Sequence, residues 1–159
     1  MDIAIRKAGK EDLPAILSLI KELAEYEKAA GEVSVTLEEL EDDGFGELPL
    51  FEAIVAEGKD GEILGMAFYY KAYSTWKGKC IYLEDIIVKQ SYRRKGIGKK
   101  LFDKVMESAY QWGAKRLMWQ VLDWNTPAIE FYKKVYQAEI SSEWLNGRLS
   151  RKQMEILLK

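Results

Sequence analysis

Hydrophobic residues in the early part of the chain follow two periods, one typical of a strand and the other of helices. Residues 3–5 alternate between apolar and polar side chains, which predicts a short strand. From 13 to 24 apolar residues recur every three or four positions, which predicts an amphipathic helix. Thr36 and Glu39 have the spacing of a capping box and predict a second, short helix that ends at Gly44.

Three β-rich runs follow and predict an antiparallel meander. They cover residues 51–57, 62–73 and 80–88, and the sequence Gly58-Lys59-Asp60-Gly61 between the first two is typical of a hairpin turn. Because short connections join antiparallel neighbours, the three runs are expected to lie side by side in one sheet.

The second half of the chain returns to helical spacing. Apolar residues from 97 to 112 predict a helix that Gly113 ends, and the strand expected next, 116–122, would lie parallel to the previous strand because a helix connects them. The remaining elements are expected to be a helix over 127–135 and strands over 138–141 and 153–158. The pattern predicts an α/β (α+β) fold, a mixed central sheet of about seven strands with helices on both faces, in a single domain over residues 1–159.

A basic loop with two glycines lies between the strand 80–88 and the helix 97–112. Glycine lets the backbone approach a ligand closely, and the first amides of a helix favour an anion, so the loop predicts a phosphate site. Neither common nucleotide motif fits: a dinucleotide fingerprint requires glycine at Leu101, and a Walker loop requires glycine at Arg93 and Ser or Thr at Lys100. The alternative is a helix start with a solvated basic face.

The composition limits the chemistry that the chain can use. Its 159 residues contain no histidine, which excludes Ser-His and Cys-His nucleophile pairs and histidine-based metal sites. The single cysteine, Cys80, has no second thiol for a disulfide or a zinc site and is expected to be a small buried hydrophobic residue. No metal is therefore expected.

Charge is balanced overall but unevenly distributed. With 24 basic and 26 acidic residues the net charge is −2, which argues against a nucleic acid as partner. Basic residues gather over 89–100 and acidic ones over 38–47, as in a cofactor pocket beside a cation site or, alternatively, two solvated helix faces. Without a signal peptide or a long apolar segment the chain is expected to be cytoplasmic and to have no membrane partner.

Arg93-x-x-Gly96-x-Gly98 after a strand resembles the pyrophosphate loop of the GNAT acetyltransferases, and the order of predicted elements is that of the GNAT fold. Longer segments extend the resemblance over nearly the whole chain to the spermidine/spermine acetyltransferase family, most closely to its thialysine Nε-acetyltransferase branch. These segments are residues 19–24, 26–27, 41–46, 73–79, 82–85 and 121–125.

The resemblance implies an acetyl-CoA-dependent N-acetyltransferase that moves acetyl directly to a primary amine of a small lysine-like or diamine acceptor. It also implies a homodimer. Polyamine acetylation is the alternative reaction, and a CoA-binding or nucleic-acid-binding module without activity is the alternative from another class. The residues that the resemblance assigns to acetyl-CoA are Ile86, Val88, Arg93, Arg94, Lys95, Gly96, Ile97, Gly98, Lys99, Asn125 and Tyr132.

Two residues are assigned to catalysis. Without histidine, a carboxylate is the natural base for the amine, and Glu84 resembles the family's base, acting directly or through water, with Asp85 holding positive charge. Strand alternation is expected to place the two carboxylates on opposite faces, and the alternative is that one of them bonds neighbouring backbone. Tyr132 matches the family's tyrosine acid for the leaving thiol.

The resemblance also places Glu27, Trp76, Glu84 and Asp85 at the acceptor site, although a surface charge and a loop hydrophobic residue are alternatives for the first two. Polyamine enzymes carry aspartate where this chain has Ser74, so Ser74→Asp is expected to shift acceptor choice toward spermidine. The family has a glycine after the tyrosine helix where this chain has Tyr136, so that turn is expected to be built differently. The sequence does not name the physiological acceptor.

Overall fold

The computed structural model describes residues 2–159, and the chain divides into two compact units, one ending at Gln120 and one formed by residues 121–159. Whether the two form the single domain expected from the sequence stays a prediction. The elements of the first unit are β1 (Ile3–Lys7), α1 (Leu13–Tyr26), α2 (Leu37–Phe45), β2 (Glu52–Gly58), β3 (Ile63–Ser74), β4 (Gly78–Val88), α3 (Ile97–Trp112) and β5 (Arg116–Trp119), with 3-10 turns at Lys10–Asp12, Ala30–Glu32 and Gln90–Tyr92.

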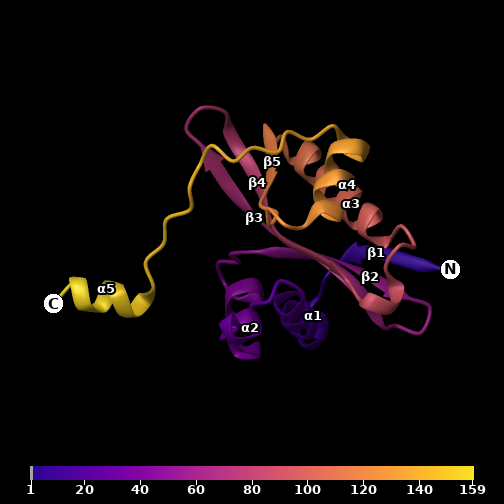
Figure 1. The fold of residues 1–159 in the computed structure, drawn as a ribbon. Helices are drawn as coiled ribbons and strands as arrows, with labels where there is room; N and C mark the ends of the chain where they lie inside the picture. The colour runs from indigo at the N-terminus through magenta and orange to yellow at the C-terminus, as the bar shows by residue number, and fades with distance from the viewer. Residues whose placement is uncertain (1) are drawn as a thin grey trace. The chain divides into compact units, whose positions relative to one another are not determined.

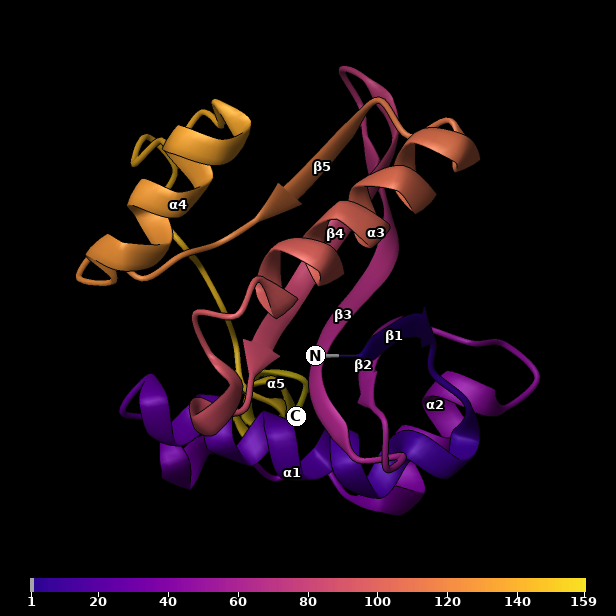
Figure 2. The same ribbon diagram turned by 90° about the vertical axis from the view of Figure 1, so that its right-hand side faces the viewer.

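The first unit is a mixed sheet with helices on both faces, as the sequence predicts. The strand order is β1-β2-β3-β4-β5, with antiparallel pairs from β1 to β4 and a parallel pair between β4 and β5. Helices α1 and α2 lie on one face and α3 on the other (Figures 1 and 2). The sheet has five strands, so the expectation of about seven is wrong.

A bulge interrupts β4 at its acidic pair. Tyr69 of β3 pairs with Leu83, but the next residue, Phe68, pairs with Asp85, so Glu84 is an extra residue in β4. The bulge changes the phase of the strand. Leu83 lies on the α3 face with Tyr69, whereas Asp85 lies on the α1 face with Phe68.

Beyond the bulge one edge of β4 has no neighbouring strand. Strand β5 is shorter than expected and pairs with β4 only from Cys80 to Leu83. In the described part of the chain, residues 84–88 therefore have β3 on one side and no strand on the other. This edge leads directly into the glycine loop.

Helix α2 confirms the capping box but not the predicted end. The Thr36 side chain accepts a hydrogen bond from the amide of Glu39 at 3.1 Å, and the Glu39 carboxylate accepts one from the amide of Thr36 at 2.8 Å. The helix continues through Gly44 to Phe45. Gly44 serves packing instead, because a Cβ there would lie 2.3 Å from the ring of Phe51.

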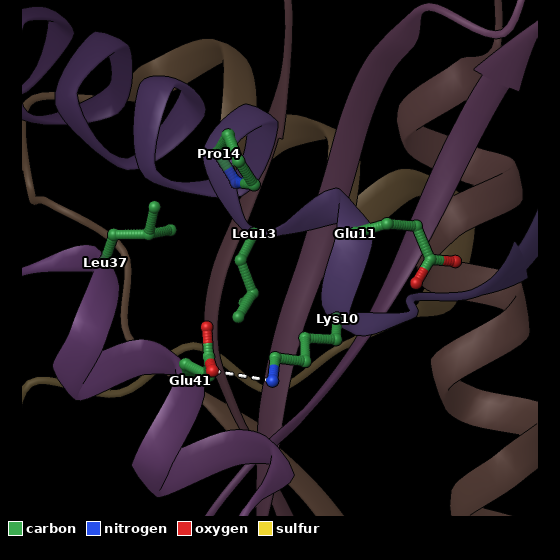
Figure 3. A pocket seen from close by; sticks show the side chains of 6 residues that line it. All are labelled: Lys10, Glu11, Leu13, Pro14, Leu37 and Glu41. Carbon is green, nitrogen blue, oxygen red and sulfur yellow. Dashed lines mark ion pairs between the residues drawn. The ribbon is translucent and has the colours of Figure 1, made fainter.

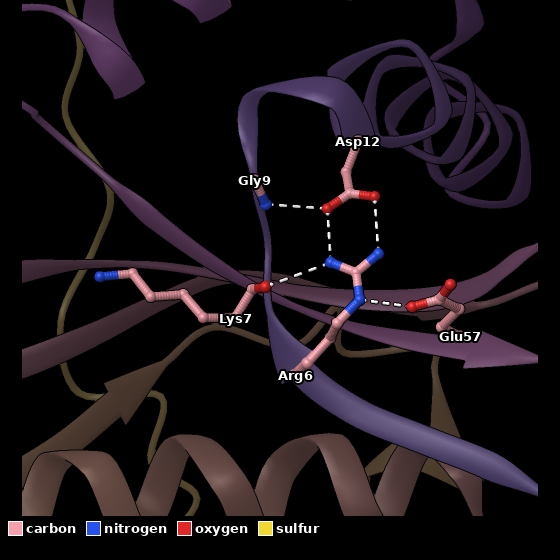
Figure 4. A network of polar contacts seen from close by, with 5 residues as sticks. All are labelled: Arg6, Lys7, Gly9, Asp12 and Glu57. Carbon is pink, nitrogen blue, oxygen red and sulfur yellow. Dashed lines mark hydrogen bonds and ion pairs between the residues drawn. The ribbon is translucent and has the colours of Figure 1, made fainter. Parts of the chain in front are cut away.

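A partly buried ion-pair network holds the start of α1 to the sheet (Figure 4). Arg6 donates two hydrogen bonds to the carboxylate of Asp12, at 2.7 and 3.0 Å, and bonds Glu57 through its Nε. The amide of Gly9 donates to the same Asp12 carboxylate at 2.8 Å. Asp12 is only 6% exposed, and these donors compensate the loss of its hydration.

The second unit contains α4 (Thr126–Tyr136) and α5 (Arg151–Leu157), with no helix or strand over residues 137–150. The two predicted strands, 138–141 and 153–158, are therefore wrong. Ser150 and Gln153 form a capping box that begins α5, with amide-to-side-chain bonds of 2.8 and 3.2 Å. A reciprocal cap of this kind favours a helix over a strand for the residues that follow it.

The turn after α4 differs from a glycine turn, as expected. The helix includes Tyr136, and Gln137 takes the left-handed conformation with φ 53°. Its amide bonds back to the carbonyl of Lys133 at 3.0 Å. A residue with a side chain thus holds the position that glycine usually has at a helix end.

Candidate active site

Three carboxylates form an acidic cluster on the α1 face of the sheet. The bulge places Asp85 on the face of Tyr70 and Tyr82, and Glu84 interacts with Tyr70 on that same face. The prediction of opposite faces is therefore wrong, because the alternation of a regular strand does not hold across a bulge. Glu27 follows the last residue of α1 and acts electrostatically on Asp85. We call Glu27, Glu84 and Asp85 the acidic cluster.

Asp85 is the most perturbed member of the acidic cluster. Burial raises the pKa of its carboxyl to about 6, and the negative charges of Glu84 and Glu27 act in the same direction. Burial also raises the pKa of Glu27. Among residues 2–159 no cation forms an ion pair with any of the three carboxylates. The negative charge of the cluster is thus not paired within the described residues.

Two tyrosines line the acidic cluster and were missed in the sequence. Tyr70 and Tyr82 are cross-strand partners whose rings stack with centroids 5.2 Å apart. Burial raises the pKa of both phenols, and the charge of Glu84 adds to it. Tyr82 precedes Glu84 by two positions, which is the spacing of neighbours on one strand face and the signal that was available.

The glycine loop has the backbone of an anion site. Arg94 and Gly96 take left-handed conformations, with φ 59° and 78°. The amide of Lys100 is the first to bond back into the helix, to the carbonyl of Gly96 at 3.1 Å. Alternating backbone conformations before a helix start turn successive amides toward one point, as in phosphate-binding nests.

Gly98 is not required by the protein itself. Its φ is not positive, and an added Cβ would meet only Val88 Cγ2, at the ordinary contact distance of 3.8 Å. A glycine that neither backbone nor packing demands, next to an anion site, fits the close approach of a ligand. The loop therefore fits the diphosphate of a CoA thioester.

The cations around the loop fall into two groups. Lys89 pairs with Glu62 at 2.7 Å, Lys99 pairs with Asp103 at 2.7 Å, and Arg93 contacts Glu22 at 3.6 Å. Arg94, Lys95 and Lys100 are exposed and have no ion pair among the described residues. The second group is the one available to phosphate.

The second unit holds two further predicted residues. The Asn125 side chain caps α4 by accepting a hydrogen bond from the amide of Ala128 at 3.4 Å. Tyr132 is 6% exposed, and burial raises the pKa of its phenol to about 12. Its ring meets Phe131 edge-on with centroids 5.4 Å apart. The assigned roles of both residues stay predictions.

The hairpin between β3 and β4 gives Trp76 and Ser74 other surroundings than those expected. Trp76 is 78% exposed at the tip, and Glu84 lies six positions after Gly78, about 20 Å along the strand. The structure therefore does not bring Trp76 to the acidic cluster. Ser74 is buried, and its Oγ accepts hydrogen bonds from the amides of Trp76 and Lys77 at 3.2 and 3.1 Å.

A pocket of about 420 Å³ lies at the opposite end of α1 (Figure 3). Since α1 has 14 residues, this pocket is about 20 Å from Glu27. It is a separate feature from the acidic cluster. Its lining residues are Lys10, Glu11, Leu13, Pro14, Leu37 and Glu41, of which Lys10 and Glu41 form an ion pair of 2.6 Å.

Residues 2–159 contain neither a cluster of metal ligands nor a membrane-spanning helix. No group of three acidic, histidine or cysteine residues is arranged to hold a metal ion. No helix in the same range is both long and apolar enough to cross a bilayer.

Comparison with known families supplies the identification. Residues 16–136 match the acetyltransferase (GNAT) family. The chain belongs to this family. A thialysine N-epsilon-acetyltransferase of Bos taurus is 48% identical over 138 residues, which are 82% of this chain and 81% of the relative. This GNAT acetyltransferase is accordingly an enzyme that transfers an acetyl group to an amine.

Two further proteins are similar to the chain only in part of their length or at low sequence identity. Spermidine/spermine N(1)-acetyltransferase-like protein 1 of Homo sapiens is 35% identical over 158 residues, which are 94% of this chain and 23% of that protein. An aminoglycoside N-acetyltransferase solved with CoA is 20% identical, covers 94% of this chain and 95% of its own, and has a TM-score of 0.72. The latter shows that the fold of this GNAT acetyltransferase is shared with a distant enzyme.

Proposed function

We propose that the protein transfers acetyl from acetyl-CoA directly to the primary amine of a lysine-like acceptor such as thialysine. The acidic cluster carries this proposal, because three carboxylates lie together and no cation of the described residues is paired with them. A substrate ammonium supplies the missing charge. The likeness to the thialysine enzyme of Bos taurus supports the choice of acceptor.

The acceptor must lose a proton before it attacks. An alkyl ammonium has a pKa of about 10.4, so that a free amine at pH 7 costs roughly 4 to 5 kcal/mol. With a pKa of about 6, Asp85 is ionised at pH 7 but more basic than an ordinary aspartate. We therefore propose that Asp85 relays the proton from the ammonium to solvent, so that the cost stays at the roughly 4 to 5 kcal/mol of a free amine at pH 7. Glu84 and Glu27 hold the ammonium. This exchanges the roles expected from the sequence.

The leaving thiolate needs stabilisation while the carbon–sulfur bond breaks and the new carbon–nitrogen bond forms. Tyr132 is the proposed donor. With a phenol pKa of about 12, full proton transfer to a thiolate of ordinary pKa about 8.5 is uphill by roughly 5 kcal/mol. Tyr132 therefore acts by hydrogen bonding to the developing thiolate, and solvent supplies the final proton.

The donor's diphosphate is proposed to bind the loop amides from Arg94 to Lys99, with the side chains of Arg94, Lys95 and Lys100 as counter-charges. Because Arg93 occupies the carbonyl of Val88, the open edge of β4 is proposed to bind the amides of the pantetheine arm through the backbone of Ile86 and the amide of Val88. Asn125 and Tyr132 complete the proposed set.

Gly98→Val tests the cofactor assignment. We expect acetyl-CoA affinity to fall at least tenfold, because the side chain occupies the ligand's approach, while the fold persists since Val88 leaves room for it. Gly31→Val is the matched control, because an added Cβ at Gly31 meets nothing within 4 Å. Equal affinities of the two variants, measured by calorimetry, contradict the assignment.

An amine panel with acetyl-CoA, followed by thiol release, tests the reaction and the acceptor. We expect a higher kcat/KM for thialysine or lysine than for spermidine. The expected effect of Ser74→Asp has a competing explanation, because Ser74 bonds two turn amides and an aspartate there would bond the same amides. A tenfold preference for spermidine overturns the choice of acceptor, and no thiol release with any amine overturns the reaction.

A homodimer is also proposed, and a cytoplasmic location stays a prediction. Trp144, Leu145 and Leu158 are 79%, 95% and 87% exposed, which is apolar surface that a partner copy would cover. Light scattering that shows only the 18.3 kDa chain at micromolar concentration contradicts the dimer.

A further inference from the structure

Arg93, the first residue of the loop motif, has its guanidinium held by protein groups. Its Nε donates a hydrogen bond to the carbonyl of Val88 at 2.9 Å, and a terminal nitrogen lies 3.6 Å from Oε1 of Glu22. The guanidinium carbon lies 5.1 Å from the ring centre of Tyr26. One planar group thus contacts a strand carbonyl, a carboxylate and an aromatic ring.

Glu22 connects the same helix to the backbone before the loop. Its Oε1 also accepts a hydrogen bond from the amide of Gln90 at 3.1 Å. Glu22 and Tyr26 are four residues apart and therefore lie on one side of α1. Glu27, a member of the acidic cluster, is the next residue after Tyr26. The contacts of Arg93 consequently join the end of α1 to the end of β4 and the start of the loop.

We propose that Arg93 is a positioning residue that holds the end of α1, with Glu27, against the end of β4, with Asp85, and does not itself bind the diphosphate. This inference rests on the proposed function, which assigns both carboxylates to the acceptor amine. It separates Arg93 from Arg94, which is exposed and without an ion pair among the described residues.

Arg93→Lys separates a positioning role from a phosphate ligand. Lysine is a good phosphate partner, but it cannot donate to a carbonyl, pair with a carboxylate and lie flat on a ring at once. We expect kcat/KM for the amine to fall at least tenfold in Arg93→Lys, nearly as far as in Arg93→Gln. A phosphate ligand would be largely replaced by lysine.

The acetyl donor gives a second readout. S-acetylpantetheine carries the thioester but no diphosphate, so a phosphate ligand is irrelevant to its use. We expect Arg93→Lys to lose the same factor with S-acetylpantetheine as with acetyl-CoA. Loss with acetyl-CoA alone overturns the inference. Lys104→Gln, which removes a surface cation paired with Glu107 on α3, is the control. It should leave kcat/KM for the amine unchanged with either donor.

Glu22→Gln also distinguishes a phosphate ligand from a positioning residue. If Arg93 bound phosphate, releasing it from Glu22 would leave acetyl-CoA binding unchanged or tighter. As part of the positioning contact, Glu22→Gln should lower kcat/KM for the amine about as much as Arg93→Lys, and the double variant should lose little more than either one. If the losses in kcat/KM of the two single variants multiply in the double variant, Arg93 and Glu22 do not act together and the inference is contradicted.

The pH profile excludes a merely structural loss. Asp85 is faced by Glu84 on its own strand and by Glu27 from α1, and both charges raise its pKa. If Arg93→Lys lets Glu27 move away, the acid limb of kcat/KM should move to lower pH, whereas partial unfolding lowers the whole profile without moving it. An unmoved limb overturns the inference. An inactive unsubstituted protein refutes the proposed function instead, while an active one with an unaffected Arg93→Lys variant refutes only this inference.

Discussion

Asp12 and Asp85 lie in the same unit, and their surroundings act on them in opposite ways. Asp12 receives two hydrogen bonds from Arg6 and one from the amide of Gly9, and these lower the pKa of its carboxyl. Burial raises the pKa of Asp85 to about 6, and the charges of two neighbouring carboxylates act in the same direction. The first site is complete within the fold, whereas the second, in the function proposed above, is completed by a cationic substrate.

The difference has a thermodynamic meaning. A carboxyl whose pKa is lower in the folded than in the unfolded state stabilises the fold once it is ionised, and one whose pKa is higher destabilises it. Asp12 therefore contributes to stability, and Asp85 reduces it. Each of the following predictions changes one side of this comparison.

The largest effect is expected from Asp85→Asn on activity. The variant keeps the size of the side chain but removes the proposed base, and we expect kcat/KM for the amine to fall by about 100- to 1,000-fold. Glu84→Gln should lose less, about tenfold. Steady-state thiol release measures both. A larger loss in Glu84→Gln would restore the assignment of Glu84 as the base.

Asp12→Asn should affect stability and leave turnover of the folded enzyme unchanged. It removes the charge that Arg6 and Gly9 bind, and we expect the free energy of unfolding to fall by about 2 to 3 kcal/mol in urea titrations at pH 7. Because the folded pKa is lowered, the contribution is present above the ordinary aspartate range and lost as pH falls through the folded pKa. The two proteins should therefore converge in acid. Glu107→Gln, which breaks an exposed pair, serves as control and should cost about 0.5 kcal/mol or less.

Asp85→Asn should increase stability at high pH. A shift from the ordinary 3.8 to about 6 corresponds to about 3 kcal/mol at full burial, and partial exposure reduces this to about 1 to 2 kcal/mol. Since the folded pKa is raised, the gain should be absent below pH 4, where both states are protonated, and complete above pH 6. Urea titrations at pH 4 and pH 8 measure it. Equal stabilities at pH 8 would mean that Asp85 is not destabilising.

The smallest effect is expected from Glu27→Gln on the pH profile. The kcat/KM of the unsubstituted enzyme should have an acid limb at about pH 6, because this parameter reports the free enzyme. Removing the charge of Glu27 should move the limb down by a few tenths of a pH unit, less than the contributions of burial and Glu84. An upward shift of the acid limb would contradict the effect of the Glu27 charge on the pKa of Asp85.

Local signals predicted most of the first unit. The capping box at Thr36, the glycine at the end of α3 and the short turns of the meander each fix an element by contacts between near neighbours in sequence. Ser150 and Gln153 are an equally local signal, and overlooking them produced the false strand. Elements that are fixed by contacts between residues close in sequence could therefore be predicted from the sequence.

The bulge at Glu84 could not be predicted from the sequence, because it leaves no trace in the hydrophobic pattern. Helices cover both faces of the sheet, so apolar residues lie on both sides of β4, and Leu83 and Ile87 are both buried although they belong to opposite faces. The change of phase is therefore invisible in the hydrophobic pattern. The contacts of Arg93 with Glu22 and Tyr26 could not be predicted either, because they depend on the docking of α1 against the loop, far away in sequence.

The open edge of β4 also bears on solubility. Residues 81–88 are apolar apart from the acidic pair and Tyr82, and a β-rich segment with one unpaired edge is a template on which other chains can polymerise. Glu84 and Asp85 stand where the pairing with β5 ends. Two such edges brought together would place like charges side by side, which repels the misassembly. The two carboxylates thus have the position of gatekeeper residues, which oppose aggregation.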